Sequence, residues 1–225
     1  MKTPLVIEFF FDLICPWCLI GKRHLSTAIA QLNKLNPDVE VEMIWRSHML
    51  LPDVPDQGLP YLQFYVQRLG SHEAVAARRV QVQRAGRLAG IDFAFGEITV
   101  MPSTQAAHRL IHFVGKHGSA QQQEALIERL LQAYFVDAED IGDHALLTRL
   151  GIKYGFDGAA VADCLGAPIS EAASEPDVQS SPRRSVGSVP SFVFNQQFTL
   201  SGALPPETLL AAMQHALSYP ALNSM

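Results

Sequence analysis

The feature that most constrains the fold of this chain is a pair of cysteines between a predicted strand and a predicted helix. Leu5 to Phe11 form a nearly continuous apolar run with β-branched and aromatic residues, which is typical of a strand covered on both faces. The run Cys15-Pro16-Trp17-Cys18 follows, and apolar residues then recur at helical spacing as far as the turn Asn36-Pro37-Asp38. This order predicts an α/β fold with both thiols at the start of its first helix.

The rest of the chain predicts one α/β domain interrupted by a helical insertion. Val39 to Trp45 alternate as in a half-buried strand, so residues 1–50 predict a strand, a helix and a second strand. Residues 51–180 have apolar side chains at three- and four-residue steps and predict helices throughout. Residues 181–225 predict two strands and a closing helix, which together complete the α/β domain.

These predicted elements have the following bounds. The helices of the insertion are Leu59–Leu69, Glu73–Ala89, Thr104–Val114, Ala120–Phe135, Asp143–Leu150 and Gly158–Cys164. The last two strands are Ser191–Asn195 and Gln197–Leu200, with a tight turn at Asn195-Gln196, and the last helix starts at Pro205 or Pro206. Parallel strands joined by a helix, then an antiparallel hairpin and a closing helix, match the mixed sheet of the thioredoxin fold.

Length and charge exclude several classes of protein. At 225 residues, with 48% hydrophobic and 17% charged residues, the chain can bury a full core. A formal net charge of −5 gives no basic field that would attract nucleic acid or an anionic membrane. Pro4 and Glu8 interrupt the region where a signal peptide needs an apolar stretch, and no segment approaches the roughly 20 apolar residues that span a bilayer. We therefore expect a cytoplasmic protein with neither nucleic acid nor membrane among its partners.

The spacing of the two cysteines predicts thiol chemistry. In a reducing compartment such a pair is more often catalytic or metal-binding than structural. Cys15 falls at a helix N-terminus, where unpaired N–H groups and the helix dipole favour a thiolate, and Pro16 suits the first turn. Cys18 lies one turn further along, deeper and within disulfide reach. We predict that Cys15 attacks and that Cys18 resolves the mixed disulfide.

A second feature that supports this prediction lies far away in the sequence. Pro190 directly precedes the predicted strand Ser191–Asn195, and a proline stands at the entrance of a strand because it cannot donate to the sheet. A cis Val189–Pro190 bond is our hypothesis for this turn. It would present the backbone of Val189 beside Cys15, where an extended substrate segment can pair with it.

Three parts of the sequence resemble the DsbA-like oxidoreductases of the FrnE subgroup. They are Phe9-Phe10-Phe11-Asp12-Leu13-Ile14-Cys15-Pro16-Trp17-Cys18 with Ile20-Gly21-Lys22-Arg23, Met101-Pro102-Ser103-Thr104 with Ala107-His108, and Val189-Pro190-Ser191-Phe192-Val193-Phe194 with Ser201-Gly202-Ala203. The resemblance covers essentially the whole chain. It implies a thioredoxin-like fold with a large all-helical insertion, a dithiol at Cys15 and Cys18 and a cis proline at Pro190.

The resemblance also leads to expectations about the site and its partners. Substrate contacts are expected from Pro16, Trp17, Val189, Pro190, Ser103 and His108, and no metal is expected. The expected activity is disulfide exchange with protein or small-thiol substrates. A cytosolic thiol such as glutathione or thioredoxin is the expected reductant, with glutathione a candidate co-substrate and no bound cofactor.

Two departures from the family pattern limit what the resemblance implies, and the second leaves the direction of electron flow open. Leu19 stands where the subgroup often has an aromatic residue, and periplasmic DsbA proteins have a signal peptide and another dipeptide between their cysteines. The dipeptide tunes the reduction potential, which spans on the order of 150 mV, or about 7 kcal/mol for two electrons, among related enzymes.

Several residues keep two interpretations each. The cysteine pair also has the spacing found in half of a zinc site, although the sequence offers no second close pair of ligands. Cys164 is a buried helical thiol or a third redox partner. Asp12 tunes the thiolate or caps the helix, and Glu8 relays a proton to Cys18 or forms a salt bridge. Arg183-Arg184 is a solvated pair or holds a carboxylate such as that of glutathione.

Two other functions compete with disulfide exchange. The kappa-class glutathione transferases and hydroxychromene-carboxylate isomerases resemble this layout, but they usually use a single nucleophile, whereas here both cysteines are present. A chaperone whose helical cleft holds partly folded chains is the third possibility. The oligomeric state cannot be predicted from the sequence.

Overall fold

The computed structural model describes residues 3–167 and 187–218, and the chain divides into two compact units. The first unit comprises residues 1–48 and 181–225, and the second comprises residues 49–180. Within the described ranges no helix is long and apolar enough to cross a membrane. Arg183 and Arg184, for which two roles were considered, lie outside the described residues.

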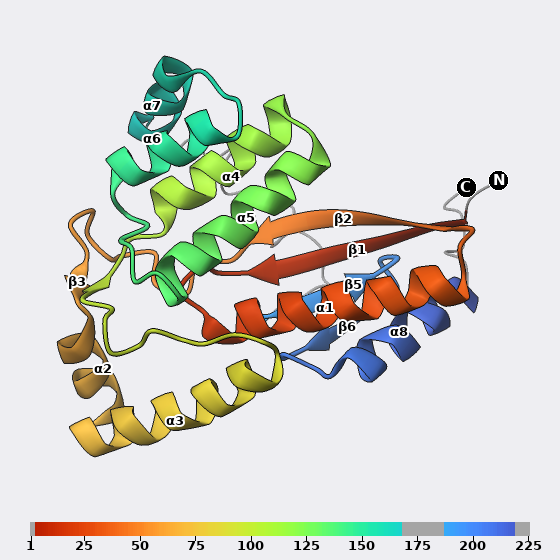
Figure 1. Ribbon diagram of the computed structural model, residues 1–225, viewed down its shortest axis with the longest axis horizontal. Coiled ribbons are helices and arrows are strands. Elements are labelled where there is room, and N and C mark those ends of the chain that lie inside the picture. Colours follow the sequence, from red (N-terminus) through yellow and green to blue (C-terminus); the bar gives the residue numbers. More distant parts are fainter. Residues whose placement is uncertain (1–2, 168–186, 219–225) are drawn as a thin grey trace. The chain divides into compact units, whose positions relative to one another are not determined.

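The first unit is built on a four-stranded mixed sheet with the strand order β2-β1-β5-β6 (Figure 1). Strand β1 pairs in parallel with β2 on one side and antiparallel with β5 on the other, and β5 pairs antiparallel with β6. The predicted sheet is thereby confirmed, with β1 in its interior. The bounds are Thr3–Phe11 for β1, Val39–Ser47 for β2, Ser191–Phe194 for β5 and Phe198–Ser201 for β6.

Helices α1 (Pro16–Leu35) and α8 (Pro206–Ser218) pack against each other and on this sheet (Figure 1). The aromatic residues of β1 and β5 make the floor beneath them, since the ring of Phe9 stacks on that of Phe192 at 4.8 Å between centroids. Helix α1 comes close to this floor at Gly21, where an added Cβ would lie only 3.3 Å from the Phe192 ring. The start of α1 is therefore held firmly against β5.

The predicted turn at Asn195-Gln196 joins β5 to β6 and also ties down its neighbours. Both residues have positive φ, 45° and 58°, as a tight hairpin turn requires. The side-chain oxygen of Asn195 accepts a hydrogen bond from the Val6 N–H at 2.8 Å, and its amide nitrogen donates to the Ala216 carbonyl at 3.2 Å. The turn thus connects β1 and α8.

The second unit is mainly helical, as predicted, but it also contains two short strands. Residues 51–180 were expected to be helical throughout, and this was wrong at β3 and β4, which pair antiparallel. Pro60 disfavours a helical Leu59, so the first helix begins only at Tyr61. Gly58, the residue before β3, has φ 72°, and a Cβ there would lie 2.4 Å from a Val100 methyl group. The elements of this unit are β3 (Leu59–Pro60), α2 (Tyr61–Leu69), α3 (His72–Leu88), β4 (Val100–Met101), α4 (Gln105–His117), α5 (Ala120–Phe135), α6 (His144–Lys153) and α7 (Gly158–Gly166).

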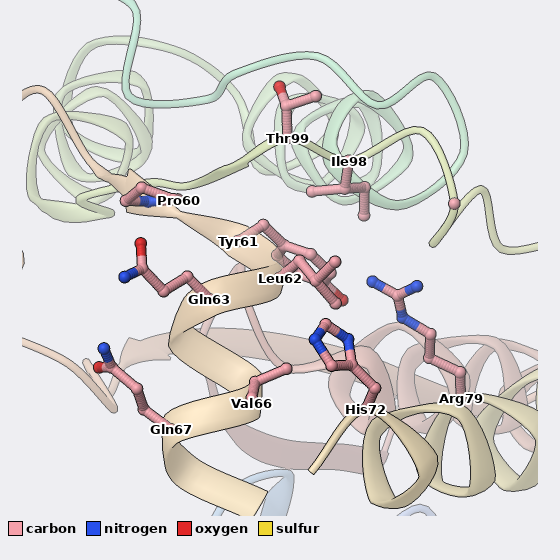
Figure 2. A pocket seen from close by; sticks show the side chains of 11 residues that line it. Pro60, Tyr61, Leu62, Gln63, Val66, Gln67, His72, Arg79, Ile98 and Thr99 are labelled. Atoms are coloured by element: carbon pink, nitrogen blue, oxygen red, sulfur yellow. The ribbon is translucent and has the colours of Figure 1, made fainter.

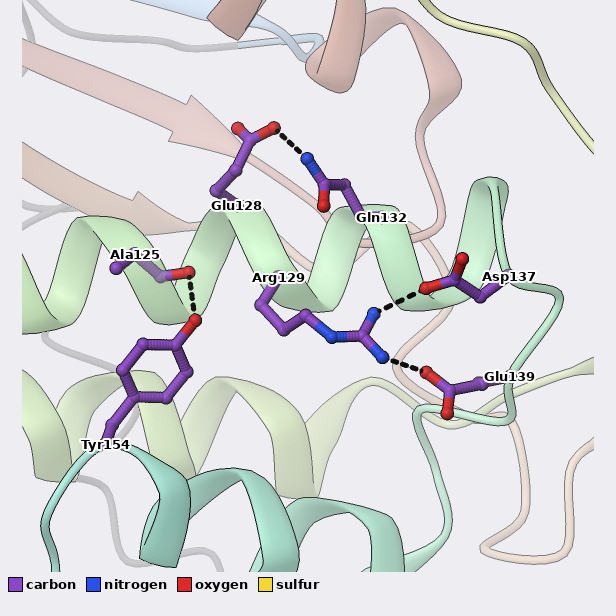
Figure 3. A network of polar contacts seen from close by, with 7 residues as sticks. All are labelled: Ala125, Glu128, Arg129, Gln132, Asp137, Glu139 and Tyr154. Carbon is purple, nitrogen blue, oxygen red and sulfur yellow. Dashed lines mark hydrogen bonds and ion pairs between the residues drawn. The ribbon is translucent and has the colours of Figure 1, made fainter.

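A polar network holds the connection between α5 and α6 (Figure 3). Arg129 on α5 forms ion pairs with Asp137, at 2.8 Å, and with Glu139. Ala138 between these two carboxylates has φ 54°, a left-handed conformation that costs an L-residue roughly 1–2 kcal/mol. The two ion pairs therefore fix the ends of a strained segment.

Candidate active site

The two cysteines lie at the N-terminus of α1, where the sequence predicted them. Cys15 is the N-cap residue, and its extended backbone (φ −94°, ψ 107°) places Pro16 at the first helical position. The Cys15 N–H donates to the Asp12 carbonyl at 3.2 Å, and the Cys18 N–H donates to the Cys15 carbonyl at 2.9 Å. This tight backbone arrangement puts both thiols, which are free, on the first turn of the helix.

The environments of the two thiols differ. Cys15 keeps 6% of its surface exposed and Cys18 keeps none. Burial is the main cause that raises the pKa of Cys18 well above its ordinary value. A hydrogen bond with Cys15 and the charge of that residue raise this pKa further, and so does the carboxylate of Asp12, whereas a hydrogen bond from the Asp12 backbone lowers it. Cys18 is therefore held as a thiol, and an attacking group reaches Cys15 first.

The turn before β5 lies beside Cys15. The Val189–Pro190 bond is cis, as hypothesised. The Cys15 thiol is 3.7 Å from the Val189 carbonyl oxygen, within the range of a hydrogen bond to sulfur. Pro190 is buried, whereas Val189 is partly exposed. Residues about 170 positions apart in the sequence thus meet at the sulfur of Cys15.

Of the two acidic residues considered, Asp12 and not Glu8 lies in the surroundings of Cys18. Asp12 is fully buried and its carboxylate accepts a hydrogen bond from the Leu13 N–H at 2.7 Å. Glu8 is also buried, but it forms an ion pair with Arg46 at 3.0 Å and does not contribute to the shifted pKa of Cys18. Alternation along β1 turns Glu8 away from α1, because Glu8 faces the opposite side of the sheet from Phe9, against whose partner Phe192 α1 packs. Asp12 lies beyond the end of β1 and is not bound by this alternation.

One residue near the site escaped the sequence reasoning. Lys22 is only 4% exposed, and its Nζ lies 5.6 Å from the centre of the Trp45 ring. A lysine this deep is uncommon, and its cation rests on the face of an aromatic ring. The available signal was its position, four residues after Cys18 and therefore on the same face of α1.

The other predicted site residues divide between the two units. Pro16 and Trp17 are half-buried beside Cys15 on the first turn of α1. Ser103 and His108 are buried at the start of α4, in the second unit. Their role in substrate binding remains a prediction.

Cys164, predicted as a buried helical thiol or a third redox partner, is helical but only partly buried. It lies on α7 in the second unit, its thiol donates to the Arg109 carbonyl at 3.6 Å, and burial raises its pKa. No group of three or more potential metal ligands occurs within residues 3–167 and 187–218.

Comparison with known families adds to this geometry. The model of the DSBA-like thioredoxin domain matches residues 6–214, which is most of the chain and includes both cysteines and Pro190. The chain belongs to this family. The prediction of a DsbA-like thioredoxin fold with a helical insertion is therefore confirmed, whereas the FrnE subgroup remains a prediction.

The individual relatives have low sequence identity to this chain. The uncharacterized protein YwbO of Bacillus subtilis is 27% identical over 159 residues, which cover 71% of this chain and 70% of that protein. A probable DsbA oxidoreductase of Streptomyces coelicolor shares the fold with a TM-score of 0.83 at 24% identity, over 98% of this chain and 93% of that one.

Two further solved structures share the fold at lower similarity. The cytosolic disulfide reductase DsbM of Pseudomonas aeruginosa, solved with GSH, has a TM-score of 0.65 at 16% identity over 95% of this chain and 100% of its own. A 2-hydroxychromene-2-carboxylate isomerase has a TM-score of 0.63 at 16% identity over 93% and 95% of the two chains. At these identities the comparison shows the fold alone. The fold does not decide the activity, because both a disulfide reductase and an isomerase have it.

Proposed function

We propose that this protein is a thiol–disulfide oxidoreductase that exchanges disulfides with protein or small-thiol substrates through Cys15 and Cys18. The observation that carries the proposal is the pairing of two unequal thiols on one helical turn. Cys15 sits at the helix N-terminus against the Val189 carbonyl, and Cys18 lies behind it, fully buried and with a raised pKa. A nucleophile at the front and a resolving thiol behind it are what sequential exchange requires.

The proposed reduction of a substrate disulfide has two steps. The Cys15 thiolate attacks one substrate sulfur, the substrate S–S bond breaks, and the departing thiolate takes up a proton from water. The Cys18 thiol then loses its proton and attacks the Cys15 sulfur. The mixed disulfide breaks, the second substrate thiol leaves, and two electrons have passed from the dithiol to the substrate, which leaves a Cys15–Cys18 disulfide. The same steps in reverse oxidise a substrate dithiol.

The causes of the raised pKa of Cys18 explain why Cys18 reacts only after Cys15. Its hydrogen bond with Cys15 and the charge of Cys15 both contribute to that shift. Both contributions end when Cys15 becomes part of a mixed disulfide, because its sulfur is then neutral and covalently bound. The pKa of Cys18 should therefore fall when the mixed disulfide forms. Cys18 is thus activated by the first step and stays protonated before it.

The backbone beside Cys15 gives a way to hold a polypeptide substrate. Val189 is partly exposed next to the reacting sulfur, and backbone pairing with an extended segment is largely independent of sequence. Pro16 and Trp17, half-buried on the same turn, supply the remaining contacts in the first unit. The predicted contributions of Ser103 and His108 belong to this proposal.

Glutathione is the small thiol that we propose as reductant or co-substrate, with thioredoxin as the protein alternative. The presence of GSH in the DsbM structure supports a glutathione-dependent cycle, and that enzyme's cytosolic location supports the cytoplasm as the compartment. The equilibrium reduction potential of the Cys15–Cys18 pair against glutathione decides the direction. A potential near or below that of the cytosol predicts a reductase or isomerase, and a much higher one predicts an oxidase.

The test of the proposal is turnover of a model disulfide by cysteine variants of the full chain. Cys15→Ser should abolish the glutathione-dependent reduction of insulin disulfides. Cys164→Ser is the matched control, because this thiol lies in the other unit and has a structural contact, and it should keep full activity. Unchanged turnover in the Cys15 variant, or a loss confined to the Cys164 variant, contradicts the proposal.

The glutathione-dependent isomerase predicted as the alternative makes a different demand on Cys18. An isomerase or transferase with a single nucleophile needs Cys15 alone, so Cys18→Ala would leave its activity intact. An oxidoreductase that needs both thiols would form the mixed disulfide in the Cys18→Ala variant but could not resolve it. Glutathione conjugation or isomerisation that survives the loss of Cys18, without disulfide turnover in the unchanged protein, would support the isomerase.

A further inference from the structure

The second unit contains an open pocket of about 710 Å³ that none of the predicted site residues lines. Its walls come from α2, from the start of α3 and from residues 96–99 (Figure 2). The volume lies within the range of small-molecule sites, about 300–1,000 Å³. All the lining residues belong to residues 49–180, so this pocket is formed within a single unit.

One end of the pocket is polar and positively charged. The guanidinium of Arg79 lies 5.3 Å from the centre of the Tyr61 ring and hydrogen-bonds to the hydroxyl of that residue. Figure 2 shows the His72 imidazole and the Arg79 guanidinium pointing toward the hydroxyl end of Tyr61. Three groups from two helices therefore converge on one point of the pocket.

Tyr61 is a neutral partner, so the positive charge of Arg79 is not balanced within the pocket lining. Its Nε is buried without a hydrogen-bond acceptor, and no described carboxylate forms an ion pair with it. Burying a donor of a cation without an acceptor is costly. The acidic residue nearest along α3, Glu73, instead accepts a hydrogen bond from its own backbone N–H at the start of the helix. A negatively charged group in the pocket would supply the counter-charge for Arg79 that the described carboxylates do not supply.

Apolar side chains lie next to these polar groups in the pocket (Figure 2). Leu62 and Val66 on α2 and Ile98 on the facing segment line it, and Leu62 keeps 43% of its surface exposed. An exposed leucine beside a partly buried guanidinium suits an amphiphilic molecule. A simple inorganic anion would leave the apolar wall in contact with water.

We propose that this pocket binds a small organic carboxylate, with its carboxylate paired to Arg79 and its apolar body covering Leu62, Val66 and Ile98. The guanidinium fork matches a carboxylate in geometry as well as in charge. His72 lies at the rim as a second donor to the same group. All residues of the proposed site belong to the second unit, whereas Cys15 and Cys18 belong to the first.

The probe for the test is 4-phenylbutyrate, with its neutral amide for comparison, titrated into the full-length protein by calorimetry. We expect the carboxylate to bind and the amide to bind at least about tenfold more weakly, because a charge-assisted pair is lost. Arg79→Gln should weaken carboxylate binding at least about tenfold. Arg78→Gln is the matched control on the same helix, where the side chain is exposed and bonds to Gln81, and it should leave the affinity unchanged. Equal binding of acid and amide, or equal effects of the two arginine variants, overturns the proposal.

A second pair of variants keeps the test valid if Arg79→Gln does not fold. Leu62 and Leu69 are both exposed on α2, but only Leu62 lines the pocket. Leu62→Glu should abolish carboxylate binding by repulsion, and Leu69→Glu should not. The Cys15→Ser variant should bind the probe with unchanged affinity. Loss of probe binding in that variant would assign the probe to the dithiol site and overturn the proposal, whatever the outcome for disulfide exchange.

Discussion

Gly21 links the start of α1 to the turn that carries Pro190, and its replacement by alanine tests that link. A Cβ at this position would lie 3.1 Å from Pro190 Cγ and 3.3 Å from Phe192 Cζ. Both contacts are shorter than ordinary van der Waals separations, so one partner has to move by a few tenths of an ångström. Neither moves easily, because the Pro190 carbonyl accepts from the Gly202 N–H at 2.7 Å and the Phe192 ring is stacked on Phe9.

Two opposing effects set the size of the change in stability. Alanine in a helix interior is favoured over glycine by about 1 kcal/mol. Overpacking a well-filled core costs about 1–3 kcal/mol. Since the floor beneath Gly21 is fixed on both sides, we expect a net loss of about 1 kcal/mol, or a Tm lower by about 2–4 °C for a chain of this size. Displacement of the Val189–Pro190 turn from Cys15 should also lower kcat/KM several-fold, because reacting groups tolerate little misplacement.

Urea unfolding followed by circular dichroism measures the first effect, and turnover of a disulfide substrate measures the second. Thr27→Ala is the control on the exposed side of the same helix, where only a hydrogen bond to the Arg23 carbonyl is lost. It should change stability by no more than about 0.5 kcal/mol and leave activity intact. A Gly21→Ala variant that is stabilised by about 1 kcal/mol and fully active would refute the claim of close packing between α1 and Pro190.

Three further changes have definite expected outcomes. Asp12→Asn removes a charge that raises the pKa of Cys18, so resolution of the mixed disulfide should accelerate at lower pH than in the unchanged protein. Stopped-flow kinetics from about pH 6 to about pH 10 should show this shift, with Asp38→Asn as an exposed control; no shift, or an upward one, contradicts it. Ala138→Gly should stabilise the chain by up to about 1 kcal/mol in urea unfolding because it relieves a positive φ, and a net loss would count against that strain. Arg129→Ala should cost no more than about 1 kcal/mol per ion pair, and less at high salt, because both carboxylates are partly exposed; a loss unaffected by salt contradicts this.

The sequence was most informative where one local pattern has one structural solution. The apolar run before Cys15 and the proline after it placed the dithiol correctly at a strand–helix junction, and Pro190 predicted the entrance of β5. Glycine and proline also marked most helix ends to within a few residues. The error at Leu59 has the same origin, because the predicted helix was extended backwards past Pro60, the residue before the first helical one.

Which side chains meet in the folded protein could not be predicted from the sequence. Glu8 and Asp12 are both acidic residues within an apolar segment, and no local pattern shows which one approaches Cys18. The face of β1 that carries α1 decides the place of Glu8, and the path of the chain after β1 decides that of Asp12. Lys22 was assigned no role from the sequence, because its partner, Trp45, comes from a separate strand. The pocket around Arg79 likewise needs three segments that only the folded unit brings together.

The central claim is that Cys15 is the attacking thiol and Cys18 the resolving one. The most direct test is to react the Cys18→Ala variant with oxidised glutathione and locate the adduct by mass spectrometry of peptides. We predict one stable mixed disulfide with glutathione, on Cys15, and no such adduct accumulating in the unchanged protein, where Cys18 resolves it. An adduct on Cys164 with none on Cys15, or a Cys15 adduct that persists equally in the unchanged protein, would contradict the account.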